Sequence, residues 1–174
     1  MKEVYPNLYC GCDKDYPPEG DNWSVVHAAR EPYHRKLGGY KTPDAPPGDS
    51  YWKIRDGDRL AANLVDVEDE RFYYEDLLAL VEDILDFIEE ELDSGKKVLV
   101  HCNKGTGRAP LICMAFIAHR GLPIYGKDFD ECEEAFKEVY PEYNPKPGFR
   151  NFLRNRWNKL EVNSKKPKKR SDNV

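Results

Sequence analysis

The chain has 174 residues and a formal net charge of −5 at pH 7, and 34% of its residues are charged. This length supports one hydrophobic core and gives no sign of a second domain. No apolar run approaches the roughly 20 residues that a membrane-spanning helix needs, which argues against an integral membrane protein.

Three short strands are predicted in the first part of the chain. Apolar and β-branched residues bounded by turn residues lie at 7–10, 24–27 and 60–64. Between the second and third of these strands, residues 35–58 are interrupted repeatedly by Gly and Pro. This composition predicts a long loop insertion with little regular structure over most of its length. A loop of this length in a compact domain is usually functional or disordered.

Helices dominate the rest of the prediction. Apolar residues at positions 77, 78, 81, 85, 88 and 92 keep one face of a helix apolar over residues 74–92. Residues 98–100, Val-Leu-Val, then predict a buried strand, and residues 111–118 a helix that is apolar on every side. Further helices are expected over 128–139 and 149–160. The order of elements predicts an α/β fold in which helices flank a central mixed sheet.

The segment between that buried strand and the apolar helix carries most of the chemical information. Residues 101–108 read His-Cys-Asn-Lys-Gly-Thr-Gly-Arg. The strand fixes Cys102 at its carboxyl end, the loop can turn successive N–H groups inward, and the helix directs its positive end to the same point. Gly105 and Gly107 allow unusual dihedral angles, and Arg108 can hold two oxygens of a tetrahedral oxyanion. This order of parts predicts a phosphate-binding loop between a strand and a helix.

The same surroundings suit a cysteine nucleophile. A free thiol has a pKa of about 8.5, and a helix N-terminus with a nearby cation lowers it by several units. We therefore expect Cys102 to be largely thiolate at neutral pH, to attack phosphorus in line and to form a phosphocysteine. His101 either supports this thiolate from behind the loop or is a satisfied core histidine at the end of a buried strand.

The pattern His-Cys-x-x-Gly-x-x-Arg after a Val-Leu-Val strand resembles the cysteine-dependent protein phosphatases, and specifically the dual-specificity phosphatase family. Similar segments lie at 6–11, 86–88, 95–100, 108–110 and 143–149, and at Trp157. The resemblance implies one phosphatase domain over residues 1–160, with the loop insertion at 35–58. It also implies hydrolysis of phosphotyrosine, phosphoserine or phosphothreonine proteins, without a metal or cofactor. Phosphate binding falls on the loop residues Asn103, Lys104, Gly105, Thr106, Gly107 and Arg108.

Such phosphatases use a carboxylic acid on a mobile loop, about thirty residues before the cysteine, to protonate the leaving oxygen and then to activate water. Residues 67–69, Val-Glu-Asp, resemble this acid loop, so Asp69 is the first candidate. The spacing from Asp69 to Cys102 is about two residues longer than usual in that family. Asp66 therefore stays as the alternative acid.

One residue departs from the family pattern. The family usually carries Ser or Thr directly after the arginine, and its hydroxyl helps the cysteine sulfur to leave during hydrolysis of the phosphoenzyme. This chain has Ala109. We expect an active enzyme with slow dephosphorylation of Cys102. One alternative is an impaired phosphatase-like protein that binds phosphorylated partners. The other is a phosphatase of non-protein substrates, such as a phosphoinositide or an RNA 5′-phosphate, which the positive charge of Lys104 could favour.

The residues just before the loop insertion are candidates for the rim of the site. The strand at 24–27 delivers Arg30, Tyr33 and His34 to the same edge as the phosphate loop. They either shape substrate access or belong to a surface excursion that packs on itself.

The last residues are basic, because 162–174 hold five Lys or Arg and one Asp. The tail at 161–174 is expected to be a disordered end, or to contact an acidic partner, nucleic acid or an import receptor. The acidic remainder argues against broad nucleic-acid binding and against a membrane-lipid substrate. Five cysteines without disulfide-like spacing predict a reducing compartment, cytoplasmic or, if the tail is an import signal, nuclear.

Overall fold

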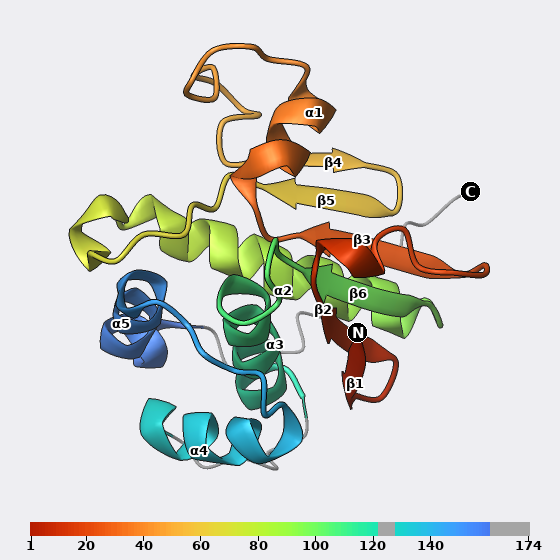
Figure 1. Cartoon of the computed structure of the whole chain (residues 1–174), viewed down its shortest axis with the longest axis vertical. Helices are drawn as coiled ribbons and strands as arrows, with labels where there is room; N and C mark the ends of the chain where they lie inside the picture. Colours follow the sequence, from red (N-terminus) through yellow and green to blue (C-terminus); the bar gives the residue numbers. More distant parts are fainter. Residues whose placement is uncertain (122–127, 161–174) are drawn as a thin grey trace, which may run out of the picture.

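A mixed six-stranded sheet forms the centre of the molecule, in the order β1-β2-β6-β3-β5-β4 (Figure 1). The computed structural model describes residues 1–121 and 128–160. The pairs β2–β6, β6–β3 and β3–β5 are parallel, and the edge strands β1 and β4 run antiparallel to their neighbours. The strands are β1 Lys2–Tyr5, β2 Leu8–Gly11, β3 Trp23–His27, β4 Lys53–Asp56, β5 Arg59–Ala62 and β6 Lys97–His101.

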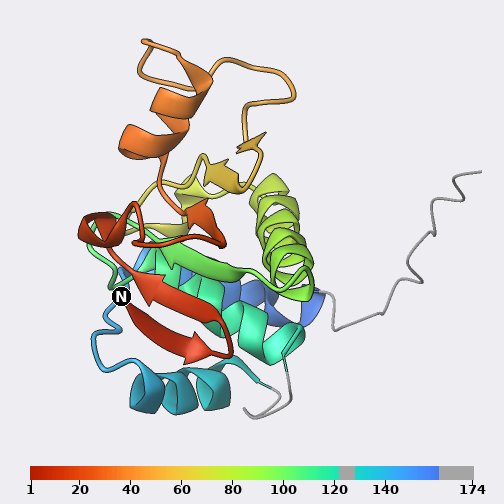
Figure 2. The ribbon, with the colours of Figure 1, turned by 90° about the vertical axis from the view of Figure 1, so that its right-hand side faces the viewer.

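The four longer helices gather on one side of this sheet (Figure 2). Side chains alternate along a strand, so Val98 and Val100 of β6 point to the helices and join the main hydrophobic core. Helix α3 lies against β2, β6, α2 and α4, which explains why it is apolar all round. The helices are α1 Arg35–Gly38, α2 Asp76–Asp93, α3 Arg108–His119, α4 Phe129–Val139 and α5 Pro147–Arg156.

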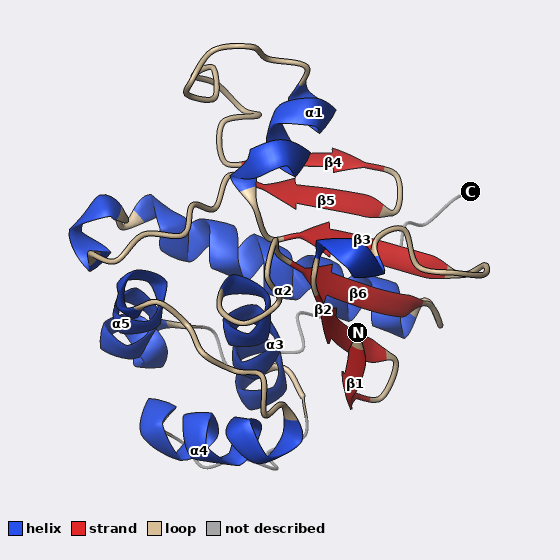
Figure 3. Cartoon of the chain, in the orientation of Figure 1, coloured by secondary structure: helices blue, strands red, loops and turns tan. Residues whose placement is uncertain are grey.

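Short helical turns follow the parallel strands (Figure 3). The turn η1 (Asp13–Asp15) comes after β2, η2 (Arg30–His34) after β3, and η3 (Glu70–Phe72) after β5. A fourth turn, η4 (Trp157–Lys159), extends α5. Because the parallel strands end at one edge of the sheet, the segments that follow them meet there, which is where ligands bind in open α/β sheets.

The predicted α/β fold with a mixed sheet and flanking helices is confirmed. The strand expected at 7–10 is shifted by one residue to 8–11, and the strand expected at 24–27 begins one residue earlier. The strand expected at 60–64 begins at Arg59 and ends at Ala62. Within the predicted loop 35–58, residues 39–52 contain no helix or strand. Residues 35–38 form α1 and 53–56 form β4, which the expectation of a long loop did not include. Three of the four residues of β4 are charged, and such an edge strand gives no alternation of apolar and polar residues to read.

Within 1–121 and 128–160, no helix is both long and apolar enough to cross a membrane. The predictions for the basic tail at 161–174 lie outside the described residues.

Candidate active site

Residues 101–108 join β6 to α3, as the sequence predicts. Cys102 follows directly on β6, and its side chain is only 2% exposed. Arg108 is the first residue of α3, so the cysteine and the N-terminal end of the helix face one short turn of chain. The partial positive charge at a helix N-terminus therefore acts on the region of the sulfur.

Carbonyl groups of this loop are bonded to other parts of the fold. Three of them accept from groups outside the loop: Asn103 from the N–H of Asp13 (3.3 Å), Gly105 from the hydroxyl of Tyr140 (2.9 Å) and Thr106 from the N–H of Asn144 (2.8 Å). A trans peptide is planar, with its N–H opposite to its C=O. We therefore expect the N–H groups that follow these three carbonyls to point to the inner side of the loop, where they can bind an anion.

Gly105 is required by both conformation and space. Its φ is +73°, a region that residues with a Cβ rarely adopt. A Cβ there would lie 2.9 Å from the carbonyl oxygen of Gly11, so the end of β2 presses directly on the loop. Gly107 has a φ of −124°, so the left-handed requirement applies to Gly105 and not to Gly107.

The guanidinium of Arg108 is buried and only partly satisfied. Its Nη1 donates to the carbonyl of Leu64 (2.8 Å) and its Nη2 to the side-chain oxygen of Asn103 (2.6 Å). Its Nε is buried and has no partner among the described residues, although Arg108 is only 7% exposed. A guanidinium has five N–H donors in one plane, so Arg108 keeps donors for an arriving oxyanion.

Asn103 connects the phosphate loop to the segment after β3. While its side-chain oxygen accepts from Arg108, its amide nitrogen donates to the carbonyl of Glu31 (2.9 Å). The backbone N–H of Arg30 donates to Leu64 O (3.0 Å), the same carbonyl that Arg108 uses. The turn η2 therefore forms one wall beside the loop, as the position of its strand predicts.

His101 lies in a buried pair with His27. The Nε2 of His101 is 2.6 Å from the Nδ1 of His27, and the rings of Tyr16 and Tyr33 pack against both. Burial lowers the pKa of His101 to about 4. Burial, followed by repulsion from His101, lowers the pKa of His27 to about 3. Both rings are neutral at physiological pH, and the support of His101 for the thiolate stays a prediction.

Asp69, the first candidate acid, is turned toward its own neighbour in the chain. Its carboxylate accepts from the backbone N–H of Arg71 (2.9 Å), and both of its oxygens accept from the Arg71 guanidinium. The hydrogen bonds from the Arg71 side chain, followed by the one from its backbone, lower the pKa of Asp69. In this arrangement Asp69 is a paired carboxylate rather than a ready proton donor.

Asp66, the alternative acid, lies in a different environment. Burial raises the pKa of Tyr73 to about 12, and the charge of Asp66 adds to this effect while that of Arg108 opposes it. The Tyr73 hydroxyl donates to the carbonyl of Val65 (2.8 Å). Asp66 and Arg108 therefore both lie within electrostatic reach of one hydroxyl, and no such link joins Asp69 to the phosphate loop in the described residues.

The three candidates for the rim of the site differ in their burial and in their contacts. Tyr33 packs on the histidine pair, and the fully buried His34 contacts the hydroxyl of Tyr40 through its ring nitrogen (3.0 Å). Arg30 remains partly exposed, with its Nη1 3.3 Å from a carboxylate oxygen of Asp44 in the loop insertion. A role of this segment in substrate access stays a prediction, with Arg30 as its charged member.

Two residues of the sequence argument and one that it missed complete the site. Ala109 is fully buried as the second residue of α3, whereas Lys104 is exposed. Lys146 lies in the segment 143–149, but no sequence pattern assigns it a role. It reaches residues 66–69, which we call the acid loop: its Nζ donates to the carbonyl of Asp66 (3.3 Å). The two residues are 80 positions apart in the chain, so no local sequence pattern predicts their contact.

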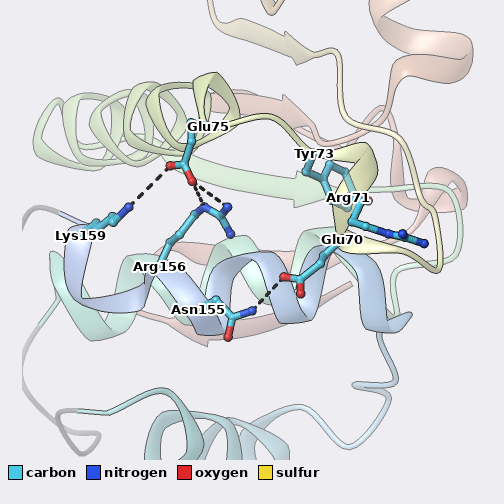
Figure 4. A pocket seen from close by; sticks show the side chains of 7 residues that line it. All are labelled: Glu70, Arg71, Tyr73, Glu75, Asn155, Arg156 and Lys159. Atoms are coloured by element: carbon cyan, nitrogen blue, oxygen red, sulfur yellow. Dashed lines mark hydrogen bonds and ion pairs between the residues drawn. The ribbon is translucent and has the colours of Figure 1, made fainter.

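A polar pocket lies behind the acid loop, between η3 and the end of α5 (Figure 4). Neither Cys102 nor Arg108 lines it. Glu75 faces Arg156 and Lys159 there, and Asn155 donates to Glu70 (2.9 Å), so its charges are largely paired with one another.

Comparison with known proteins agrees with this geometry. The family model "Dual specificity phosphatase, catalytic domain" matches residues 45–159. Human dual specificity protein phosphatase 5 is 40% identical over 68 residues, which cover 39% of this chain and 18% of that protein. The rat protein of the same name is 43% identical over 42 residues, which cover 24% of this chain and 11% of that protein. The chain thus matches less than a fifth of the length of these relatives.

Solved structures share the fold at low sequence identity. Human DUSP28 superimposes with a TM-score of 0.55 at 22% identity, covering 88% of this chain and 89% of that one. DUSP15 gives 0.58 at 21%, covering 90% and 86%. The human tyrosine phosphatase-like serine/threonine/tyrosine-interacting protein gives 0.59 at 19%, covering 91% and 95%. With a family model that matches more than half of its residues, and with this loop and fold, the chain belongs to the dual specificity phosphatase catalytic domain family.

Proposed function

We propose that this protein hydrolyses phosphate monoesters, in the first place of phosphorylated proteins, through a phosphocysteine on Cys102. Membership of the family implies cysteine-dependent phosphatase chemistry and phosphorylated substrates in general. The observation that supports the proposal most is the buried Arg108 at the end of the phosphate loop. Its Nε has no partner among the described residues. A buried donor left unsatisfied costs about 1–3 kcal/mol, which an oxyanion in this position would recover.

The chemistry proceeds in two steps. The thiolate of Cys102 attacks phosphorus, the S–P bond forms, and the bond to the leaving oxygen breaks as that oxygen takes a proton from Asp69 or Asp66. The same carboxylate then removes a proton from water, which attacks phosphorus and releases the thiolate and inorganic phosphate. Arg108 and the loop N–H groups hold the remaining phosphoryl oxygens throughout, and one such donor is worth roughly 10²–10³ in rate.

Ala109 makes the second step slow in this proposal. Its methyl group is fully buried directly after Arg108 and offers no hydroxyl to the departing sulfur. The phosphocysteine therefore accumulates. Stopped-flow hydrolysis of p-nitrophenyl phosphate is expected to show a burst, and Ala109→Ser is expected to raise the steady-state rate several-fold. A linear trace with unchanged turnover in the variant counts against this step.

Replacement of the proposed nucleophile, Cys102, tests the overall proposal. Vanadate-sensitive hydrolysis of p-nitrophenyl phosphate is expected in the wild-type protein and lost in Cys102→Ser. Cys132→Ser, which changes another buried cysteine on α4, is the matched control and should keep the activity. Hydrolysis that survives in Cys102→Ser, or is absent from the wild type, overturns the proposal.

A second candidate function is capture of phosphorylated partners without turnover. The pairing of Asp69 with Arg71 and the absence of a hydroxyl at Ala109 favour it. One structural neighbour is named a tyrosine phosphatase-like, interacting protein. Binding of a phosphopeptide by a wild-type protein that releases no phosphate would select this function over hydrolysis.

Non-protein substrates are a further alternative for the same chemistry. The exposed Lys104 and the partly exposed Arg30 add positive charge around the loop, which suits a substrate with several phosphates. A panel of phosphotyrosine and phosphothreonine peptides, a phosphoinositide and an RNA 5′-triphosphate separates these classes. The protein proposal requires a higher kcat/KM on at least one peptide than on the other two substrates.

A further inference from the structure

One short stretch of chain contacts both halves of the candidate site. Residues 143–148, which we call the bridge, run from the end of the α4 region to the start of α5. On the side of the phosphate loop, the N–H of Asn144 donates to the carbonyl of Thr106 (2.8 Å). The Cα of Pro145 lies 3.4 Å from the position of a Cβ on Gly107, which is ordinary van der Waals contact. The bridge therefore packs directly against the loop that holds the nucleophile.

On its other side, the bridge contacts the acid loop. The Nζ of Lys146 donates to the carbonyl of Asp66 (3.3 Å) and lies 3.5 Å from a carboxylate oxygen of Glu68. Gly148 packs so closely that a Cβ would be 2.2 Å from the carbonyl oxygen of Val67 and 3.2 Å from the carbonyl carbon of Glu68. Real Cβ atoms do not approach backbone so closely, so any side chain at this position displaces the acid loop.

The bridge itself is anchored by a buried charge. The hydroxyl of Tyr143 donates to one oxygen of Glu133 (2.6 Å), and the guanidinium of Arg150 donates to both oxygens (2.6 and 2.7 Å). Glu133 is only 4% exposed, and hydrogen bonds to a buried charge are directional and strong. Tyr143 is the first residue of the bridge and Arg150 lies just beyond its last residue, so both of its ends are fixed to α4.

We propose that Lys146 and Gly148 are positioning residues for the general acid. They hold residues 66–68 at a fixed place beside the phosphate loop, so that a carboxylate of the acid loop reaches the leaving oxygen of a substrate on Cys102. This inference rests on the proposed function. A misplacement of about 1 Å can cost roughly 10²-fold in rate when groups must meet in one geometry, and Gly148→Ala forces a displacement of that order.

The expected effect depends on the leaving group, which distinguishes positioning from general damage. Phenyl phosphate releases a phenol with a pKa near that of tyrosine, about 10, and needs protonation. Difluoro-methylumbelliferyl phosphate releases a far more acidic phenol that leaves without it. Gly148→Ala is expected to lower kcat/KM on phenyl phosphate by about 10–100-fold and to change the other substrate less than about twofold.

Variants at Lys146 carry the test if Gly148→Ala does not fold. Lys146→Met is expected to lower kcat/KM on phenyl phosphate by about fivefold or more, and Lys146→Arg should restore it because the charge and the donors return. Lys53→Met removes another half-exposed lysine with an ion pair, to Asp83, and is the matched control. Equal losses on both substrates, or no loss on either, overturn the positioning role.

A second measurement does not require activity. In Lys146→Met, hydrogen exchange at the backbone amides of residues 65–70 is expected to become faster, including that of Val67, whose N–H now faces the Tyr73 hydroxyl at 3.4 Å. Amides of residues 103–107 should keep their wild-type exchange. Unchanged exchange in the acid loop overturns the inference even if the protein proves to be a phosphate binder, whereas absent hydrolysis with altered exchange overturns only the proposed function.

Discussion

The phosphate loop and the acid loop are held in opposite ways. Most of the phosphate loop is buried, three of its carbonyls are bonded to other parts of the fold, and Gly105 is pressed against the end of β2. The acid loop is more open: the Asp69 side chain is 35% exposed and that of Glu68 70%. The bonds of Asp69 stay within its own turn, with Arg71. The difference teaches that the donors proposed to bind an oxyanion are already in place in the folded state, whereas Asp69 would have to leave Arg71 before it could donate a proton.

The largest effect on activity is expected from a substitution in the phosphate loop, the more rigid of the two segments. Arg108→Lys replaces a planar fork by a single ammonium, which cannot serve Leu64, Asn103 and an oxyanion together. We expect kcat/KM to fall about 10³-fold and vanadate binding, measured by calorimetry, to weaken in parallel. Arg154→Lys, at an exposed ion pair with Asp130, is the control. An Arg108→Lys protein with near wild-type activity would mean that the loop does not bind phosphate as described.

The next effect separates the two candidate acids. Asp69→Asn and Asp66→Asn each remove one proton donor, and loss of the true acid should lower kcat/KM on phenyl phosphate, which reports the first step, by about 100-fold or more. The pH–rate profile of that variant should also lose the limb that falls as pH rises, because a general acid works only while protonated. If both variants keep that limb, the acid lies outside this loop and the comparison between the two loops has no catalytic meaning.

A smaller effect is expected from releasing Asp69. Arg71 lowers the pKa of Asp69, so Arg71→Met should raise it, and more of the carboxyl is then protonated at neutral pH. The falling limb of the pH profile of kcat/KM moves to higher pH, and kcat/KM on phenyl phosphate at pH 7 rises several-fold. Arg154→Met is the matched control because its pair with Asp130 is similar but lies on α5. A shift of the limb to lower pH would contradict the described pairing.

The smallest effect concerns the support behind the phosphate loop. His27, His101 and His119 have pKa values lowered chiefly by burial, to about 3, 4 and 4. A lowered pKa means that the unfolded chain binds these protons more readily, so stability is present above the unfolded value near 6.5 and is lost as pH falls below it. Urea unfolding between pH 7 and 5.5 should show a loss of roughly 1 kcal/mol per histidine.

His119→Leu provides the control for that titration. It removes one of the three groups at a site beside Trp157, away from the phosphate loop. The loss of stability between pH 7 and 5.5 should shrink by roughly 1 kcal/mol relative to the wild type. A free energy of unfolding that does not change over this pH range in the wild-type protein contradicts the buried, neutral state of the three rings.

The sequence predicts the rigid half of the site better than the open half. Cys102, Arg108 and the glycine at φ +73° lie within seven residues, where a strand, a turn and a helix leave one geometry. The central strand β6 can be predicted because its middle residues 98–100 are all apolar, and α2 because one of its faces is apolar. The edge strand β4 was missed because its charged residues carry no such pattern.

The rest depends on contacts that sequence spacing does not encode. Nothing in the residues 66–69 shows that Asp69 pairs with Arg71, since the same residues in an extended loop would leave it free. The contact of Lys146 with Asp66 joins segments that approach only when α5 packs on the core. The resemblance of residues 143–149 to a family segment marked that region as part of the domain, without showing which of its residues touch the acid loop.

Helix α5 packs in the hydrophobic core and also contacts the acid loop, which affects how activity changes on heating. Phe149 and Phe152 belong to the hydrophobic core, and both rings pack on Tyr73, while Gly148 in the first turn abuts the acid loop. Helix ends fray before the whole domain melts. On heating, activity on substrates with poor leaving groups should therefore be lost first. Substrates with good leaving groups should still be hydrolysed until the whole domain unfolds.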